Sequence, residues 1–459
     1  MEEAAQISLM REFEGAMLGD RRRRDRLKAM ARLMSVDPSA SFPAAMKTNA
    51  ALEGAYRLLR NEAVSMDGIL AGHFEETAAR AAQERVVLAV HDSSIFKFAG
   101  DEWRDGLGPT HGGQGFYAHF SLLVVPGEAR RPLGVIAIQK WTRPVGGQKK
   151  HKLRGQSLEA ARWKNGAALA EERAGQGCSL VHVMDREGDS YDLWAELMAA
   201  KSRFVIRNSR KRLLEDGGTL ADAVARAKTV VEREVRLSRR VKSTQVDARK
   251  QAQPRSVRIA RLALSGQTVR ISRPSRCSEE LPETITLNFV HVREIGTHGD
   301  EPPVDWMLAT TEPIGTADEI ERVVDIYRSR WVVEDYFKTL KTGCEYEKRQ
   351  LESESTLANA LAIFIPIAWQ LLLLRSLSRD DADAAATEAL TSTQIEVLVA
   401  VSNGKLPTMP TVRQALLAIA GLGGHIKNNG DPGWIVLGRG FRHLLVLEQG
   451  WKAAKRSDQ

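Results

Sequence analysis

Two short apolar runs, each followed within two residues by an aspartate, constrain the fold of this chain more than any other feature of its sequence. Val86–Val90 precedes Asp92, and Leu180–Met184 directly precedes Asp185. Short apolar runs with polar residues on both sides predict buried strands. We therefore expect Asp92 and Asp185 at the carboxyl ends of two strands that could be neighbours in one sheet.

The segments around these runs predict further strands and helices in a definite order. A Pro126-Gly127 turn joins two apolar runs, which is typical of an antiparallel hairpin. The expected elements are strands at 120–125 and 133–139, a helix at 157–173, a helix at 191–200 and a strand at 203–207. Three strands, a helix, a strand, a helix and a strand predict an α/β fold with a mixed sheet flanked by helices.

The remaining sequence predicts a β-rich insertion and two helical ends. Between residues 212 and 304, four alternating tracts are separated by polar or Gly/Pro turns, and a strand returning to the core is expected at 304–310. The four tracts are TVVEREVRL, RSVRIARLAL, QTVRISR and ETITLNFVHVREI. We predict a helical N-terminal domain over residues 1–75, a central domain over 76–355 that contains the insertion, and a helical C-terminal domain over 356–459.

The most apolar run lies at residues 357–374 and contains Asn359 and Pro366. It is barely long enough to span a bilayer, so we expect a buried core helix and no membrane association. The three cysteines, Cys178, Cys277 and Cys344, form neither a zinc spacing nor a disulfide framework, which favours a reducing compartment. The N-terminus lacks the basic start and apolar region of a signal peptide, so we expect a cytoplasmic protein.

The charge of the chain favours a polyanionic partner. The net charge is +8 and the pI is near 9.4, and basic residues gather in two clusters. Each cluster suits phosphate contact, but the first could also be a solvated helix face and the second a solvated loop. The first cluster is Arg21, Arg22, Arg23, Arg24 and Arg26, and the second is Arg207, Arg210 and Lys211.

Four side chains suited to phosphodiester chemistry follow one another in the run IYRSRWVVEDYFKTLKTG. Tyr327, Arg330, Glu334 and Lys341 are spaced i, i+3, i+7 and i+14. We expect one continuous helix over residues 316–342, begun by the acidic residues 318 and 319, which brings the four side chains to one face. A solvated helix with paired charges produces the same pattern, so this segment alone does not decide the function.

Asp92, Asp185 and Glu334 form a candidate set of metal ligands. Metal-dependent phosphoryl transfer needs carboxylates that converge from rigid elements on two Mg²⁺ ions about 3.5–4 Å apart. Asp92 could instead be a turn residue, and Asp185 could cap the following helix. Glu187 and Asp189 are alternative ligands to Asp185, which we favour because it follows the apolar run directly.

Three tracts of the sequence resemble the catalytic motifs of one family. HDSSIFKF, MDREGDSYDLW and YRSRWVVEDYFKTLKTG are similar to the three motifs of hairpin-forming bacterial DDE transposases, the insertion-sequence group with the Tyr-Arg-Glu-Lys signature. LGDRRRRDRL and EGAYRLLRN resemble the family's N-terminal segment that binds the ends of the element. GLGGHIKNNGDPGW resembles its C-terminal region, so the resemblance extends over essentially the full chain.

This resemblance implies a fold and a set of roles. It implies an RNase H-like catalytic domain with a β-strand insertion between Asp185 and Glu334, which agrees with the insertion predicted above. Asp92, Asp185 and Glu334 would bind two Mg²⁺ ions per active site, with Mn²⁺ as a substitute. Arg330 and Lys341 would hold DNA phosphates, and Tyr327 would donate a hydrogen bond to a phosphate.

The resemblance also implies DNA contacts. Trp306 matches the tryptophan on which these enzymes stack a flipped base, a contact worth about 1–3 kcal/mol, although a core tryptophan at a strand start fits the sequence equally well. The first basic cluster would bind the DNA end. Phe98 stands where the family often has tyrosine, and QSLEAARW follows the family pattern loosely, so these departures concern DNA contacts. His91, His119 and His182 lie in or beside expected strands and are expected to be structural.

The resulting hypothesis is a cut-and-paste DNA transposase, an Mg-dependent endonuclease and strand-transfer enzyme of the bacterial nucleoid. It would bind inverted-repeat ends of double-stranded DNA, cleave them through a hairpin, and join the 3′-OH ends to target DNA. Two protomers would pair the ends as a homodimer through their C-terminal helices. The alternatives are an inactive DNA-binding relative that inhibits or represses transposition, and a metal nuclease without strand transfer.

Overall fold

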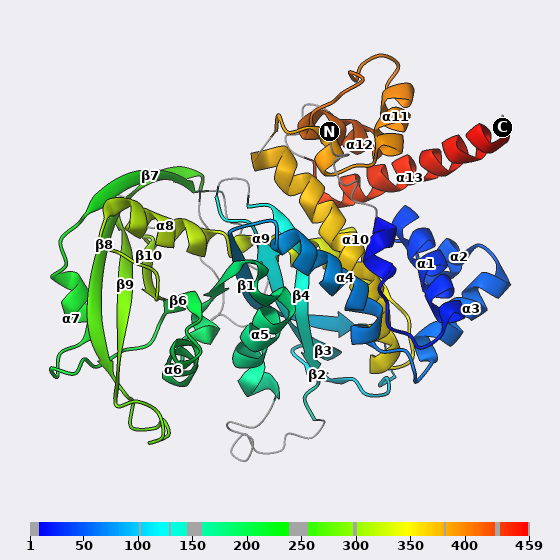
Figure 1. The fold of residues 1–459 in the computed structure, drawn as a ribbon. Coiled ribbons are helices and arrows are strands. Elements are labelled where there is room, and N and C mark those ends of the chain that lie inside the picture. The colour runs from blue at the N-terminus through cyan, green and yellow to red at the C-terminus, as the bar shows by residue number, and fades with distance from the viewer. Residues whose placement is uncertain are drawn as a thin grey trace. The chain divides into compact units, whose positions relative to one another are not determined.

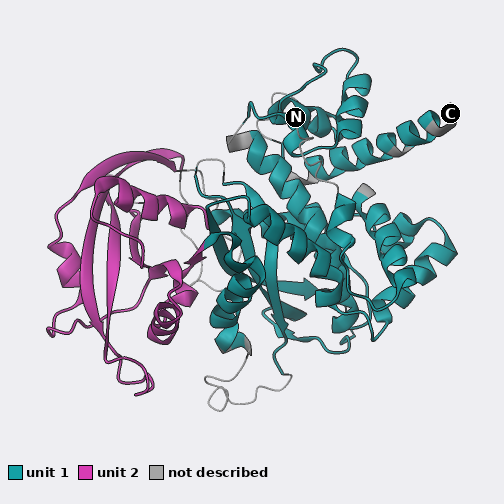
Figure 2. Cartoon of the chain, in the orientation of Figure 1, with its two compact units in different colours: residues 1–179, 331–459 teal, residues 180–330 magenta. Residues whose placement is uncertain are grey.

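The chain divides into two compact units in a computed structural model, which describes residues 9–100, 102–127, 130–144, 158–237, 256–296, 301–380, 382–426 and 432–457. Unit 1 consists of residues 1–179 and 331–459, and unit 2 consists of residues 180–330 (Figure 2). The domain boundaries expected near residues 75 and 355 stay predictions.

Unit 1 begins with short helices, as the sequence predicts. Three of these helices start at a hydroxyl cap: Ser41, Thr48 and Ser65 each accept a hydrogen bond from a backbone N–H in the first turn. Asp20 caps the first helix in the same way. The elements are η1 (Leu9–Phe13), α1 (Arg21–Val36), α2 (Phe42–Met46), α3 (Asn49–Arg60) and α4 (Met66–Ala81) (Figure 1).

The strands of unit 1 form an antiparallel layer around β3 (Gly113–Val124). β1 (Val86–Phe98) pairs with one edge of β3, and β4 (Pro132–Trp141) and the short β2 (Gly108–Thr110) pair with the other edge. The predicted hairpin is therefore confirmed. The predicted helix after it is α5 (Leu158–Ala174), which packs against β3 and β4.

The expectation that Asp92 lies at the end of its strand is wrong. β1 continues past the apolar run to Phe98, because residues 88–98 pair without interruption with residues 124–114 of β3. Asp92 therefore lies inside β1, opposite Phe120. Pairing with a partner strand carries β1 through the polar residues 91–94 to the apolar residues that follow them.

Unit 2 contains one parallel strand pair followed by antiparallel strands. β5 pairs in parallel with β6, and the order continues through β10, β9, β8 and β7 in antiparallel fashion. These strands, together with the predicted helical ends, confirm the α/β fold class with a mixed sheet and a β-rich insertion. The elements are β5 (Ser179–Met184), which begins at the last residue of unit 1, η3 (Arg186–Gly188), α6 (Tyr191–Ala199), β6 (Arg203–Asn208), α7 (Leu220–Ala225), β7 (Val231–Leu237), β8 (Arg258–Ser272), β9 (Thr284–Ile295), β10 (Asp305–Thr310) and α8 (Ala317–Arg328).

Two expected strands of the insertion are one strand. β8 runs through Ser265 and Gly266, because residues 261–272 pair without a break with residues 295–284 of β9. A Cβ on Gly266 would come within 3.0 Å of Ile320 and 3.2 Å of Ile314. Glycine at this position therefore lets the sheet approach α8, rather than marking a turn.

The expectation of one continuous helix over residues 316–342 is also wrong. The observed helix α8 begins where the sequence predicts, with a capping box between Thr316 and Glu319. It ends at Arg328, where the backbone N–H of Ser329 bonds to two carbonyls and that of Arg330 bonds to the Tyr327 carbonyl only three residues back. A second helix, α9 (Trp331–Lys338), follows, and a π-helical turn, η5 (Thr339–Gly343), carries Lys341.

The C-terminal part of unit 1 contains a long apolar helix, α10 (Glu354–Asp380), which packs against α4, β4 and α12. The apolar window of this helix is buried throughout, as expected for a core helix. Asn359 donates hydrogen bonds to the carbonyls of Leu59 and Val64 and so joins α10 to the N-terminal helices. The other elements are η6 (Tyr346–Lys348), η7 (Ala386–Glu388), α11 (Ser392–Val401), α12 (Val412–Leu422) and α13 (Trp434–Ser457); residues 427–431, within the C-terminal tract of the resemblance, lie outside the described residues.

Candidate functional site

Asp185 lies where β5 ends and the short η3 turn begins, as the sequence predicts. One carboxylate oxygen accepts a hydrogen bond from the backbone N–H of Glu187 at 2.7 Å. Burial raises the pKa of Asp185, while this hydrogen bond and the positive charge of Arg330 act in the opposite direction. A bound cation would stabilise the charged form of such a carboxylate.

The structure separates Asp185 from its two alternatives. Glu187 is exposed on the turn. Asp189 is fully buried and forms an ion pair with the buried guanidinium of Arg212. Its carboxylate also accepts hydrogen bonds from Asn208, Ser209 and the backbone of Arg210. These contacts occupy the Asp189 carboxylate in the protein interior, and the choice of Asp185 over Glu187 stays a prediction.

The aromatic and basic residues predicted from the family motif gather near Asp185 in unit 2. The rings of Trp306 and Tyr327 meet edge to face with centroids 5.5 Å apart. The guanidinium of Arg207 lies 6.0 Å from the Trp306 ring and donates a hydrogen bond to the Asp305 carbonyl at 3.3 Å. Burial raises the pKa of Tyr327, with the charges of Arg330, Arg207 and Asp185 acting on it as well.

The exposure of Trp306 bears on its two possible roles, a stacking surface for a base or a core tryptophan. Trp306 is the second residue of β10 and is only partly buried, in contrast to Trp194 of the same unit, which is fully buried. A core tryptophan would be enclosed, so the partial exposure of Trp306 is compatible with a stacking surface.

Asp92 and Glu334 lie on two elements of unit 1 that pack together, β1 and α9. Directly opposed residues of an antiparallel pair share one face of the sheet, so Asp92 and Phe120 face the same side. The Phe120 ring contacts the rings of Tyr336 and Phe337 in α9, with centroids 5.9 and 5.3 Å away. The side chain of Asp92 therefore leaves the sheet on the face that α9 covers.

Lys341 contacts the same strand as Asp92. Its ammonium donates a hydrogen bond to the Ile95 carbonyl at 2.6 Å and lies 3.7 Å from the carboxylate of Glu347. Glu347 in turn accepts a hydrogen bond from the backbone N–H of Lys97 at 2.9 Å. Burial lowers the pKa of Lys341, and the neighbouring Glu347 acts in the opposite direction.

The predicted metal ligands belong to both units, Asp92 and Glu334 to unit 1 and Asp185 to unit 2. Carboxylate oxygens are the ligands that Mg²⁺ prefers, so the chemistry of the set fits this ion. Within the described ranges, no group of three or more His, Cys, Asp or Glu side chains is arranged to hold a metal ion. The meeting of these three carboxylates stays a prediction.

The histidines beside the strands are buried, in agreement with a structural role. His91 and His119 stack with ring centroids 5.8 Å apart, and hydrogen bonds join them to Ser121 and Ser93 respectively. Burial, helped by the charge of Arg162, lowers the pKa of His119 to about 3. His119 is therefore neutral at physiological pH, and His182 is equally buried.

The first basic cluster forms the start of α1. Arg21, Arg22 and Arg24 are exposed, Arg23 donates a hydrogen bond to the Leu18 carbonyl, and the Arg26 guanidinium lies against Gly54 of α3. Cations at a helix N-terminus oppose the helix dipole. The cluster is thus unfavourable for the helix itself, which favours an external anion over a merely solvated face.

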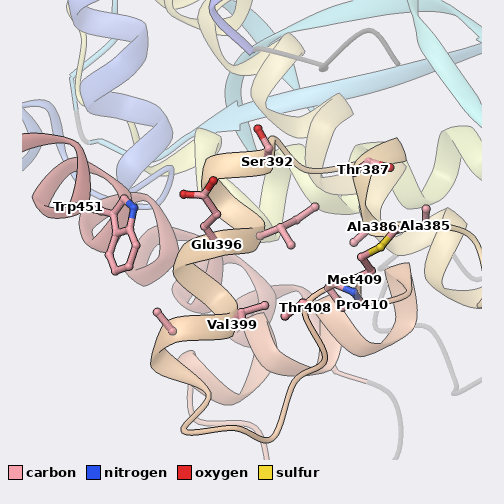
Figure 3. Close-up of a pocket in the computed structure, with 12 residues that line it drawn as sticks. Ala385, Ala386, Thr387, Ser392, Glu396, Val399, Thr408, Met409, Pro410 and Trp451 are labelled. Atoms are coloured by element: carbon pink, nitrogen blue, oxygen red, sulfur yellow. The ribbon is translucent and has the colours of Figure 1, made fainter. Parts of the chain in front are cut away.

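An apolar pocket of about 570 Å³ lies in the C-terminal part of unit 1, between α11, the segments around residues 386 and 409, and Trp451 of α13 (Figure 3). Glu396 and Ser392 are among its few polar lining residues. None of the residues predicted from the sequence to act on DNA lines this pocket.

Sequence reasoning missed two sets of contacts, one in each unit. Glu347 follows Lys341 by six positions, which is not a helical spacing, so no local signal pairs them. The sequence presents Asp189 only as a candidate metal ligand. Its hydrogen bonds to residues 208–212 depend on how the end of β6 lies beside η3. The strand pattern predicts β6 but not its register against β5, so it does not predict these bonds.

Comparisons with known proteins agree with the sequence motifs. Residues 8–64 match the family model described as Transposase DNA-binding, and residues 172–366 match the model described as Transposase DDE domain. The second match includes Asp185, Glu334 and Lys341, whereas Asp92 precedes it. Domains of this type generally use divalent metal ions. The two matches support a DNA-binding transposase.

Among solved structures, the chain is similar to the cryo-EM structure of the piggyBac transposase synaptic complex with hairpin DNA. The sequence identity is 11% and the TM-score is 0.35, over 82% of this chain and 73% of that chain.

Proposed function

We propose that this chain is a cut-and-paste DNA transposase that cleaves the ends of its element through a hairpin and joins them to target DNA. One observation carries the proposal. Asp185 at the end of β5 has Tyr327, Arg330 and the partly exposed Trp306 around it, inside the segment that matches the transposase DDE domain. A carboxylate, a phenol, a guanidinium and an open aromatic ring together suit a strained DNA end.

The proposed reaction consists of successive exchanges at phosphorus. A water molecule attacks a phosphodiester at the element's end, one P–O bond forms, and the bond to the 3′-oxygen breaks. The freed 3′-OH attacks a phosphodiester of the opposite strand, which forms a hairpin and releases the 3′-oxygen of the flanking DNA. A second water attacks the hairpin phosphodiester and releases the element's 3′-OH. This 3′-OH then attacks a phosphodiester of the target DNA and releases a 3′-OH of the target. No covalent enzyme intermediate is required at any step.

The residues of the chain have distinct roles in this scheme. Asp92, Asp185 and Glu334 would hold two Mg²⁺ ions, or Mn²⁺ in their place. Bound metal would activate the attacking oxygen and neutralise the leaving oxygen. Arg330 and Lys341 contact the phosphates beside the scissile bond. Tyr327 donates a hydrogen bond to a phosphate, which requires the protonated phenol, and burial favours that form by raising its pKa.

The DNA itself is held by residues outside the metal site. Trp306 stacks the base that leaves the strained end, and Arg207, Arg210 and Lys211 contact nearby phosphates. Arg21, Arg22, Arg23 and Arg26 at the start of α1 bind the inverted repeat. Two copies of the chain pair two ends as a homodimer, in the bacterial cytoplasm where the nucleoid supplies target DNA.

A cleavage assay tests this function and separates its rivals. The purified chain is incubated with Mg²⁺ and a duplex carrying the inverted repeats found beside its own coding region, with E334Q as the control. We expect nicked, hairpin and joined products from the unchanged chain and none from E334Q. Binding without nicking would support an inactive DNA-binding relative, and nicking without hairpins or joined products would support a simple nuclease.

A further inference from the structure

The two aspartates of the run DREGD, Asp185 and Asp189, have different surroundings. β5 and β6 are parallel, with Met184 opposite Ile206. The chain therefore leaves both strands at the same edge of the sheet, at Asp185 in one case and at Arg207 and Asn208 in the other. The turn that follows β6 carries the exposed residues Arg210 and Lys211.

The carboxylate of Asp189 accepts hydrogen bonds from the backbone of this turn. One carboxylate oxygen accepts hydrogen bonds from the successive backbone N–H groups of Ser209 and Arg210, at 2.6 and 2.7 Å. The side chain of Asn208 donates to both oxygens at 3.2 Å, and the Ser209 hydroxyl donates as well. Successive N–H groups that converge on one point form a concave anion site, and here a carboxylate of the protein fills it.

Arg212 closes the far side of the turn. Its guanidinium bonds to the other oxygen of Asp189 and lies 4.2 Å from the centroid of the Trp194 ring. Both partners of this ion pair are almost completely buried. The backbone is therefore fixed on both sides of Lys211, at residues 208–210 and at residue 212, while the side chains of Arg210 and Lys211 stay exposed.

We propose that Asp189 is a positioning residue, which fixes the turn so that Arg210 and Lys211 meet DNA phosphates beside Asp185. This inference rests on the proposed function. A buried ion pair contributes little net stability compared with apolar residues of the same volume. The bonds of Asp189 do fix the turn before DNA arrives, which removes an ordering cost from binding.

The test uses a pair of substitutions, because D189N alone leaves the buried charge of Arg212 without its counter-ion and is expected to destabilise unit 2. The double variant D189N/R212Q replaces the ion pair by a neutral pair. R210A/K211A is the reference for the loss of the two cations. Each protein is measured for thermal stability, for hydrogen exchange at the amides of residues 209 and 210, and for binding to a short mixed-sequence DNA duplex over a range of salt concentrations.

We expect D189N/R212Q to fold, to exchange these two amides faster than the unchanged chain, and to bind DNA with a weaker salt dependence. The slope of log binding constant against log salt should fall by about 1–2, close to the effect of R210A/K211A. Combining all four substitutions should lower the slope no further. These results together would establish that Asp189 acts on DNA through the turn.

Two results would overturn the inference. Unchanged amide exchange in D189N/R212Q would mean that Asp189 does not hold the turn. Faster exchange with an unchanged salt slope would mean that the shape of the turn is irrelevant to DNA. Failure of the proposed function is seen separately: if the chain nicks no DNA end while the exchange and slope results stand, the transposase assignment fails and the positioning role survives.

Discussion

The regions around Asp92 and Asp185 differ, although a similar sequence pattern leads into both. At Asp185 the strand stops, the carboxylate caps a short turn, and burial raises its pKa. At Asp92 the strand continues for six more residues, and the side chain leaves a face of the sheet that α9 covers. One proposed ligand thus comes from a turn and the other from the interior of a paired strand, so their variants should lose activity alike but differ in stability.

Loss of either carboxylate should have the largest effect. In D92N and D185N we expect nicking of the DNA end to fall by on the order of 10³-fold, because each removes a ligand from a metal that supplies several kcal/mol to the transition state. E187Q is the matched control on the η3 turn and should keep nearly full activity. Loss of activity in E187Q, with D185N active, would transfer the ligand role from Asp185 to its neighbour.

Lys341, which contacts β1 near Asp92, provides a test in unit 1. K341M should slow nicking by roughly 10- to 150-fold, the equivalent of one charge-assisted hydrogen bond. Because burial lowers the pKa of Lys341, the ammonium loses its proton at a lower pH than an exposed lysine, and nicking should fall as pH rises through that value. K341R keeps its charge, so its pH profile should lack this alkaline fall. An identical fall in K341R would show that another group titrates.

Trp306 provides a test in unit 2, the unit that contains Asp185. W306A should lower the yield of hairpin from nicked ends by about 5- to 150-fold, the equivalent of one lost base stack, with the first nick less affected. W103A is the control, because Trp103 is also partly exposed, at 54%, but lies in unit 1 on the loop before β2. Equal effects of both substitutions on the hairpin step would contradict a specific stacking role.

The smallest expected effect concerns stability without metal. A carboxyl group whose pKa is raised in the folded state costs stability as pH rises through the window between its ordinary value of 3.8 and the raised value. D185N removes that cost and can still accept the hydrogen bond from Glu187. Its free energy of unfolding should therefore exceed that of the unchanged chain at neutral pH, with no difference below the window.

Denaturant unfolding in the presence of a chelator measures this difference. D92N is examined alongside, to determine whether the gain is particular to the strand end. A loss of stability in D185N at neutral pH would mean that the charge of Asp185 is favourable in the folded chain, contrary to the direction of its pKa shift.

The sequence by itself predicted the kinds of most elements, their order and a set of candidate site residues. Apolar runs predicted β5 and the β3–β4 hairpin, and the acidic residues at 318 and 319 predicted the start of α8. These features depend on neighbours within a turn or a strand, so a short window contains the physics that decides them. The motif residues were identified in the same way, from local spacing and from resemblance.

Tertiary structure alone decided where these elements stop and which polar groups are already used. β1 extends through Asp92 because β3 pairs with it, and Lys341 reaches the carbonyl of Ile95, which lies 246 positions away. α8 ends at Arg328, before three of the four signature residues. Near this end, Arg233 of β7 donates two hydrogen bonds to the carboxylate of Asp325. Asp185 and Asp189 have the same side chain. Only Asp189 lies within hydrogen-bond distance of residues 208–212, which follow the end of β6. Such contacts join residues distant in sequence, so no local pattern encodes them.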